Sequence, residues 1–375
     1  MPDPISVQAF RHSEPGSPSQ SRSVPDIDAL VRNSRIIWGA IAAMAVATIV
    51  GFRMANLSLA WTSGGTFLIC VVVFLAVSSF YRRFRPDPSI TFGTECCVQL
   101  ALVLSLGCAL SYPLAAAGFP YRDAALNAAD TWMGLDWRAY LHFINNRPLL
   151  GTLMHLAYSS MIFQLLLLIV SLAAPSRLVR LQQYIFATAL ALSVTLVVFA
   201  FIPAGGIYSF LKIQPDEFAN LSPIMTTDQI LRLDALRSGE HRVVSEMAGL
   251  ITFPSFHAVW AILFMWGFYP VKQLRFGAIY LNLLVIASTP IQGAHYFIDL
   301  FGGAVVAAIA IYGATRLMRP ARSQTTTISA EPTVPSSIGN QSSTRNIAED
   351  ERACEYGSHH TTASRPRPTR RLIHS

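Results

Sequence analysis

The chain has 375 residues, of which 52% are hydrophobic and only 13% are charged. Ordinary soluble domains carry about 25% charged residues, so this composition excludes a water-covered globule and predicts a protein that lies in a lipid bilayer. The formal net charge is +7, and much of the positive excess lies in the C-terminal tail. We expect this basic tail to bind anionic lipid headgroups beside the last span rather than nucleic acid.

The first 34 residues are polar and rich in Ser and Pro, and they lack the apolar core of a signal peptide. We expect this segment, residues 1–34, to be disordered and cytoplasmic. A bilayer core requires about 20 apolar residues per helix, and eight later runs meet or approach that length. They are Ile36–Phe52, Leu57–Phe80, Thr91–Gly118, Leu149–Ala173, Gln183–Pro203, Pro254–Val271, Phe276–Gln292 and Tyr296–Leu317.

These runs predict an all-α fold, a polytopic transmembrane helix bundle of about eight spans. Residues 35–90 contain two additional transmembrane helices, and residues 91–319 contain a six-helix membrane core. The remaining segment, residues 320–375, is basic, rich in Thr, Ser and Pro, and without apolar periodicity. We expect it to form a disordered cytoplasmic tail.

Basic residues near the span ends predict the orientation, because cytoplasmic loops carry an excess of Lys and Arg. Five clusters fall on alternate sides of the spans: Arg32 and Arg35; Arg82, Arg83 and Arg85; Arg177 and Arg180; Lys272 and Arg275; Arg316, Arg319 and Arg322. All five therefore share one face, which we assign to the cytoplasm with both termini. The long loops, Phe119–Pro148 and Ala204–Thr252, lie on the other face, and Asp and Trp residues in the first predict an interfacial amphipathic segment.

His257 directly precedes an apolar run, in the segment Thr252-Phe-Pro-Ser-Phe-His-Ala258. Proline is favoured in the first turn of a helix, and a serine there caps free backbone N–H groups. We therefore expect His257 in the first turn of the sixth span, at its outer end. Free N–H groups and the positive end of the helix dipole make this position suitable for a phosphate.

His295 and Asp299 lie four residues apart, so on a helix they would share one face. The carboxylate would accept a hydrogen bond from one ring nitrogen, which fixes the tautomer and leaves the other nitrogen as nucleophile or base. The predicted topology places this pair on the same membrane face as His257. The following Gly302 and Gly303 predict close packing of this helix against a neighbour.

Two other interpretations compete with phosphoryl chemistry. A lone histidine near a helix end is more often structural, and this is our interpretation of His142 and His155. Asp299 differs, because a carboxylate in an apolar span is costly without a partner and is a functional candidate by default. Two histidines and an aspartate also match a metal site. Because they form no specific zinc signature, we rank that site second and predict neither a bound metal nor a cofactor.

Two motifs resemble those of the type 2 phosphatidic acid phosphatase superfamily. Residues 254–257, PSFH, are similar to its Pro-Ser-x-His motif, and Ser288, His295 and Asp299 are similar to its Ser-Arg-x5-His-x3-Asp motif. The wider segments FPSFHA and GAHYFIDLFGG resemble the inositol phosphorylceramide synthase (inositolphosphotransferase) branch. The resemblance covers about residues 203–312, and more loosely the whole six-helix core.

This resemblance implies a lipid phosphatase or phosphotransferase that acts on a lipid phosphate or phospholipid without a metal, so the six-helix core would be catalytic. His295 would attack the phosphorus and form a phosphohistidine, Asp299 would orient His295, and His257 would protonate the leaving oxygen. Ser255 and Phe256 would lie in the substrate-binding part of the site. Water or an acceptor alcohol would then take the phosphoryl group.

Three departures from the family pattern affect phosphate binding and favour the transferase branch. The Lys-x6-Arg-Pro motif, expected after the fifth span, is not recognisable, Phe256 replaces a glycine, and Thr289 replaces an arginine. A phosphoryl transition state requires charge stabilisation. The outer loop offers Lys212, Arg232, Arg237 and Arg242 as substitutes, and we select Lys212 and Arg242 as substrate-binding candidates.

Two functions of different classes remain at this point. The first is an integral membrane lipid phosphatase or phosphotransferase with its site on the non-cytoplasmic face. The second is a non-catalytic membrane protein, a lipid-headgroup binder or transporter, that keeps only the outline of the site. The missing basic motif supports the second.

Overall fold

The structure is a computed structural model, and it describes residues 27–60, 64–84, 87–240, 242–244 and 247–318. Internal contacts divide the chain after Arg322. The predicted tail, residues 320–375, and most of the predicted N-terminal segment lie outside the described residues.

Three long helices form the N-terminal part of the bundle. They are α1 (Ile27–Met54), α2 (Gly64–Phe84) and α3 (Pro88–Ala116), and the two-residue strand β1 (Ser58–Leu59) follows α1. α1 begins inside the segment predicted to be disordered, because its first turns are buried. Gln182 donates to the carbonyl of Leu30 at 2.9 Å, and Ser34 donates to the Glu95 carboxylate at 2.5 Å.

Short helices, a bent helix pair and a long helix come next along the chain. They are α4 (Asp123–Trp132), α5 (Trp137–Asn145), α6 (Pro148–Ser159), α7 (Met161–Leu172), the 3-10 helix η2 (Pro175–Arg177) and α8 (Leu178–Phe201). The axes of α6 and α7 meet at an angle of 46°. α8 contacts α1, α3, α11 and α13, and it is therefore the central helix of the bundle.

The last part of the chain contains the short elements of the second long loop and three apolar helices. They are α9 (Ile207–Phe210), η3 (Pro215–Phe218), α10 (Asp228–Ser238), β2 (Val243–Val244), α11 (Phe256–Phe268), α12 (Arg275–Gln292) and α13 (Phe297–Leu317). β2 pairs in parallel with β1. The fold is thus mostly helical, as predicted, with one two-residue strand pair added.

In the part of the chain that the structure describes, four helices are long and apolar enough to cross a bilayer. These are α1, α3, α8 together with η2, and α13, and the bent pair α6–α7 makes a fifth if it is one span. Each of the eight predicted runs overlaps a helix. However, α11 has only 13 residues, which at 1.5 Å per residue is about 20 Å against a bilayer core of about 30 Å. The described residues thus indicate an integral membrane protein with four to five spans by length and composition, and the predicted count of eight is not confirmed.

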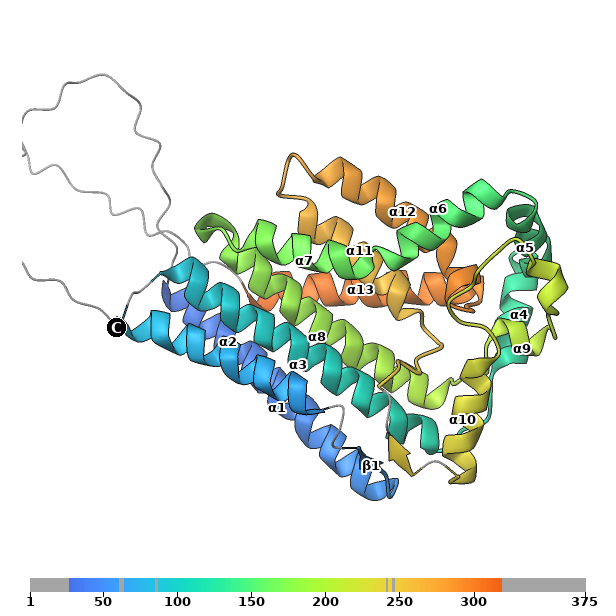
Figure 1. The fold of residues 1–375 in the computed structure, drawn as a ribbon, viewed down its shortest axis with the longest axis horizontal. Coiled ribbons are helices and arrows are strands. Elements are labelled where there is room, and N and C mark those ends of the chain that lie inside the picture. The colour runs from blue at the N-terminus through green and yellow to red at the C-terminus, as the bar shows by residue number, and fades with distance from the viewer. Residues whose placement is uncertain (1–26, 61–63, 85–86, 241, 245–246, 319–375) are drawn as a thin grey trace, which may run out of the picture. The chain divides into compact units, whose positions relative to one another are not determined.

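The two ends of the helix bundle carry different elements (Figure 1). The α2–α3, α7–α8 and α11–α12 connections and the end of α13 lie toward one end, and α4, α5, α9 and α10 gather toward the other. Arg82 lies in the last turn of α2, Arg177 ends η2, and Lys272 lies between α11 and α12, so these basic residues belong to the first end. The starts of α11 and α13, with His257 and His295, belong to the second.

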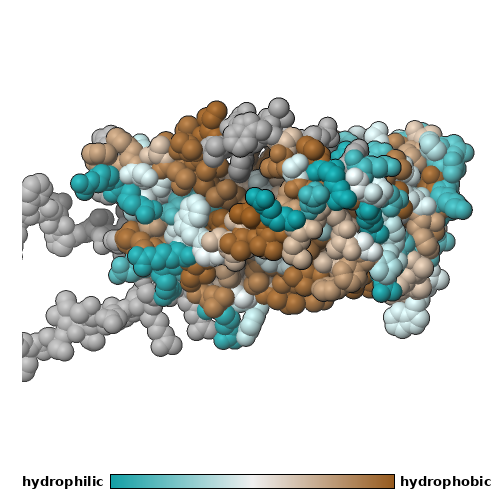
Figure 2. Space-filling model, turned by 90° about the horizontal axis from the view of Figure 1, so that it is seen from below, coloured by the Kyte–Doolittle hydropathy of each residue, from teal (hydrophilic) through white to brown (hydrophobic). Residues whose placement is uncertain are grey.

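Apolar side chains cover much of the bundle surface. Phe163 and Val170 of α7, Tyr280 of α12 and Val305 of α13 are each more than half exposed. Figure 2 shows hydrophobic residues gathered over the middle of one face, with hydrophilic residues more frequent toward its right-hand end. Contiguous exposed apolar surface is unusual in soluble monomers, and it fits helices that face lipid.

Candidate active site

His257 lies in the first turn of α11, where the sequence predicts it. Ser255 is the N-cap of this helix, and its hydroxyl accepts a hydrogen bond from the Ala258 N–H at 3.4 Å. The Ser255 N–H donates to the carbonyl of Asp299 at 3.1 Å. This bond joins the first turns of α11 and α13, so both helices present their N-terminal ends to the same site.

Close packing of α11 against α13 depends on the predicted glycine pair. A Cβ atom at Gly303 would lie 2.8 Å from the carbonyl oxygen of Ser255, and one at Gly302 would lie 3.0 Å from Cβ of Pro254. A side chain at either position would push the two helices apart. The glycines therefore set the separation between His257 and the segment that carries His295.

His295 contacts Asp299, but not from a shared helix face as predicted. Nδ1 of His295 lies 2.9 Å from Oδ2 of Asp299, although α13 begins only at Phe297. The same Oδ2 accepts a hydrogen bond from the Tyr296 N–H at 3.0 Å. Asp299 therefore caps the start of α13 and holds the ring of His295, which precedes the helix and folds back over its first turn. The positive φ of Ala294, 56°, belongs to the turn that makes this possible.

The two histidine rings share one buried space with a tyrosine ring. The centroids of His257 and His295 are 6.3 Å apart, and Tyr158 of α6 stacks on His257 with centroids 4.7 Å apart. Burial lowers the pKa of His295 to about 4, although a bond to the carbonyl of Thr252 opposes the shift. The His295 ring is therefore neutral near pH 7, which is its nucleophilic form.

Two buried aspartates of α4 hold the start of α13 and the loop before it. Asp130 accepts backbone hydrogen bonds from the N–H groups of Phe297 at 2.8 Å and Ile298 at 2.7 Å. Burial raises the pKa of Asp130, and these two bonds partly offset the rise. The Asp130 carboxylate thus accepts hydrogen bonds from the first N–H groups of α13. At the start of α11, the Ser255 hydroxyl accepts one such bond, from the Ala258 N–H.

Asp123 makes a second clamp between the long outer loops. Its carboxylate accepts hydrogen bonds from the N–H groups of Gly205 at 2.8 Å and Gly206 at 3.0 Å, and from the hydroxyl of Tyr296 at 2.8 Å. Gly206 has a φ of 99°, which favours glycine. This clamp ties the segment after α8 to the residue that follows His295.

The predicted interfacial segment is therefore a support for the candidate site. Asp123 and Asp130 are 8% and 2% exposed, and Trp137 of α5 donates to the carbonyl of His295 at 3.2 Å. These supporting roles were not predicted from the sequence. One signal was present, because a spacing of seven residues places Asp123 and Asp130 on one face of a helix.

The substrate-binding candidates lie in different places. Ser255 caps α11 beside His257, and Phe256 packs on Trp260 of the same helix with ring centroids 5.9 Å apart. Lys212 has a φ of 55° in the turn after α9. Arg242 precedes β2, and its guanidinium donates to the carbonyl of Ala55 at 3.0 Å, so it is held at the end of α1.

Thr289, at the position of the family's arginine, is equally engaged within its own helix. Its hydroxyl donates to the carbonyl of Val285 at 2.8 Å, as does the hydroxyl of Ser288 at 2.7 Å. The structure thus brings Ser255, His257 and His295 together with Asp299, whereas the guanidinium groups of Arg242 and Arg237 donate to the carbonyls of Ala55 and Ala115.

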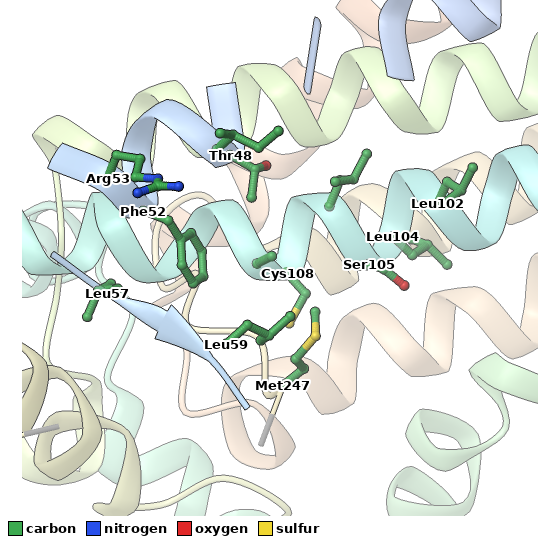
Figure 3. A pocket seen from close by; sticks show the side chains of 13 residues that line it. Thr48, Phe52, Arg53, Leu57, Leu59, Leu102, Leu104, Ser105, Cys108 and Met247 are labelled. Atoms are coloured by element: carbon green, nitrogen blue, oxygen red, sulfur yellow. The ribbon is translucent and has the colours of Figure 1, made fainter. Parts of the chain in front are cut away.

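A large cavity lies elsewhere in the bundle and differs chemically from the histidine site. It has a volume of about 700 Å³ between α1, α3 and Met247, with Arg53 among its mostly apolar lining residues (Figure 3). Phe52, Leu57 and Cys108 also line it. Among the described residues, no three His, Cys, Asp or Glu side chains are grouped closely enough to hold a metal ion.

Comparison with known proteins identifies one family. A model of the PAP2 superfamily matches residues 124–313, slightly more than half of the 375-residue chain. The matched region contains nearly all of α4 and most of α13, and it includes all four residues that the structure brings together. No curated protein and no solved structure matches the chain.

Proposed function

Because the chain belongs to the PAP2 superfamily, we propose that it is an integral membrane lipid phosphatase or phosphotransferase acting through a phosphohistidine on His295. Membership of this superfamily suggests a lipid phosphate or phospholipid as the substrate. The observation that carries the proposal is the 2.9 Å contact between His295 Nδ1 and Asp299, with the ring of His257 facing His295.

In the first step, His295 attacks the phosphorus of the substrate. Since a carboxylate can only accept a hydrogen bond, the ionised Asp299 fixes the proton on Nδ1 and leaves the lone pair on Nε2. As the Nε2–P bond forms, the bond between phosphorus and the leaving oxygen breaks. His257, which becomes protonated beside the anionic phosphate of the bound substrate, gives its proton to that oxygen, and Asp299 stabilises the positive charge on the phosphorylated ring.

In the second step, the acceptor removes the phosphoryl group. His257, now neutral, takes a proton from water or an alcohol, and the acceptor oxygen forms a bond to phosphorus. The P–N bond breaks and its electron pair returns to Nε2 of His295. Both histidines thus regain the states in which they began.

Transfer to an alcohol, with an inositol phosphate group as the transferred unit, is the finer proposal. It is supported by the segments FPSFHA and GAHYFIDLFGG, which contain His257 and His295. A panel of lipid phosphates and phospholipids, with and without inositol, tests it in the presence of an acceptor alcohol. Phosphate release with equal rates for all lipids would instead identify a hydrolase.

We place the site on the non-cytoplasmic face. The basic residues Arg82, Arg177 and Lys272 lie at the opposite end of the bundle from the starts of α11 and α13. Positively charged loops remain in the cytoplasm, so the histidines would face outward. Both chain termini would then be cytoplasmic.

Substitution of the nucleophile is the direct test of the proposed function. His295→Ala should abolish transfer or release of phosphate from a labelled lipid without preventing membrane insertion. His142→Ala is the matched control, because His142 lies on α5, is about half exposed and has the Glu217 carboxylate 3.8 Å from its ring. Full activity of the His295 variant would exclude the mechanism.

A non-catalytic lipid-headgroup binder or transporter is the second candidate. Two observations favour it. Thr289 stands where the family motif has an arginine, and its hydroxyl donates to the carbonyl of Val285. Arg242, a candidate substitute, donates to the carbonyl of Ala55. Trapping of an acid-labile phosphohistidine separates the two candidates. Binding of lipid phosphates with no label on His295 would support the binder.

A further inference from the structure

Tyr158 is a buried residue of the histidine site to which neither the sequence motifs nor the mechanism above gives a role. It lies near the end of α6, and it is 6% exposed. Its hydroxyl oxygen is buried and has no hydrogen-bond partner in the described part of the chain. A buried hydroxyl without a partner is uncommon, because it loses its bonds to water and gains none in return.

The position of this hydroxyl relates it to both histidines. The Tyr158 ring stacks on the ring of His257 with an interplanar angle of 30°. A Cβ atom at Gly293 would lie 2.8 Å from the Tyr158 hydroxyl oxygen and 2.8 Å from Cδ2 of His295. The hydroxyl and the His295 ring edge next to Nε2 therefore border the same small space, which the absence of a side chain at Gly293 keeps open.

A phosphoryl group bonded to Nε2 of His295 would lie next to this space. Its non-bridging oxygens accept hydrogen bonds and gain negative charge, and a fixed donor in a water-excluded site stabilises such charge. The arginine of the family motif is replaced by Thr289, whose hydroxyl donates to Val285. The hydroxyl of Tyr158 is a donor that is still unused.

We propose that the Tyr158 hydroxyl binds a non-bridging phosphoryl oxygen of the lipid substrate and takes over part of the role of the missing arginine. This inference rests on the proposed function, and it deepens it by naming the donor that recognises the phosphate ester. By stacking on it, the Tyr158 ring would also position the ring of His257. Only the hydroxyl is at issue, because phenylalanine would preserve the stacking.

The test compares Tyr158→Phe with Tyr184→Phe in the full chain. Tyr184 of α8 is also fully buried, and its ring also stacks on α11, against Phe264 with centroids 6.0 Å apart. The two variants thus remove the same atom from two tyrosines packed against one helix. With a labelled lipid phosphate, we expect Tyr158→Phe to lower the rate of phosphohistidine formation by about 100-fold, and Tyr184→Phe to leave it within about twofold.

Orthovanadate, a mimic of the phosphoryl transition state, gives a readout that a purely structural role would not change. Its inhibition constant should rise in Tyr158→Phe by a factor similar to the loss in kcat, with KM nearly unchanged. Equal labelling rates and equal vanadate inhibition for Tyr158→Phe and the wild type would overturn the proposal. Absence of label in the wild type with every lipid tested would refute the proposed function, and this inference with it.

Discussion

Replacing Asp130 by alanine should loosen the start of α13 and, with it, the segment that carries His295. The Asp130 carboxylate accepts hydrogen bonds from the N–H groups of Phe297 at 2.8 Å and Ile298 at 2.7 Å. These are among the first N–H groups of α13, for which the helix itself offers no acceptor. Without the carboxylate, both donors depend on whatever water can reach them.

The size of the effect follows from this geometry. A single side-chain cap contributes about 0.5–2 kcal/mol, and a buried donor left without a partner costs about 1–3 kcal/mol. Asp130 is 2% exposed, but Phe297 and Ile298 are partly exposed, so water recovers part of the loss. We therefore expect Asp130→Ala to lower the free energy of unfolding by about 2–4 kcal/mol. Asp130→Asn, which keeps one acceptor oxygen, should cost about half as much.

Thermal unfolding of the chain in detergent measures this difference. At roughly 2 °C per kcal/mol for a large domain, Asp130→Ala should lower the apparent Tm by about 4–8 °C. Asp136→Ala is the matched control, because Asp136 is exposed and caps α5 through a single bond to the Ala139 N–H at 3.0 Å. An exposed cap lies at the lower end of the range, at about 0.5–1 kcal/mol, so the Tm of Asp136→Ala should fall by about 1–2 °C. Equal Tm changes for the two alanine variants would refute the reasoning.

Three further predictions concern the reaction, the site geometry and the orientation. Asp299→Asn should lower kcat by about 10³-fold while retaining the cap on Tyr296, because the neutral amide no longer stabilises the charged ring of His295; near-normal turnover with a labelled lipid would contradict this role. Gly293→Ala should lower activity by about 100-fold, since its Cβ would lie 2.8 Å from the His295 ring, whereas Gly277→Ala in α12, the helix that Gly293 caps, should retain wild-type rates because no atom lies within 4 Å of its Cβ. In a cysteine-free background, an impermeant thiol reagent applied to intact cells should label Asp216→Cys but not Arg83→Cys, both at exposed positions; the reverse pattern would invert the proposed topology.

The sequence by itself determined the membrane character and the identity of the candidate catalytic residues. The low charge content and the long apolar runs require lipid as the solvent, whatever the arrangement of the helices. Pro254 and Ser255 place His257 at a helix start through local capping chemistry, and the structure has the helix begin at Phe256. The spacing of His295 and Asp299 likewise predicted their contact, because four residues are few enough for local geometry to decide.

Only the tertiary structure decided how these residues are held and what surrounds them. His295 lies before α13 rather than on it, and its position depends on contacts with α4 and α5, more than 150 residues earlier in the chain. Tyr158 reaches the site because α6 packs against α12, and Arg242 is kept from the rings by a bond to Ala55. Such contacts join segments that no local pattern connects, since their energy comes from burial and pairing after the helices have assembled. Tertiary contacts likewise determine the length of α11 and the burial of the first turns of α1.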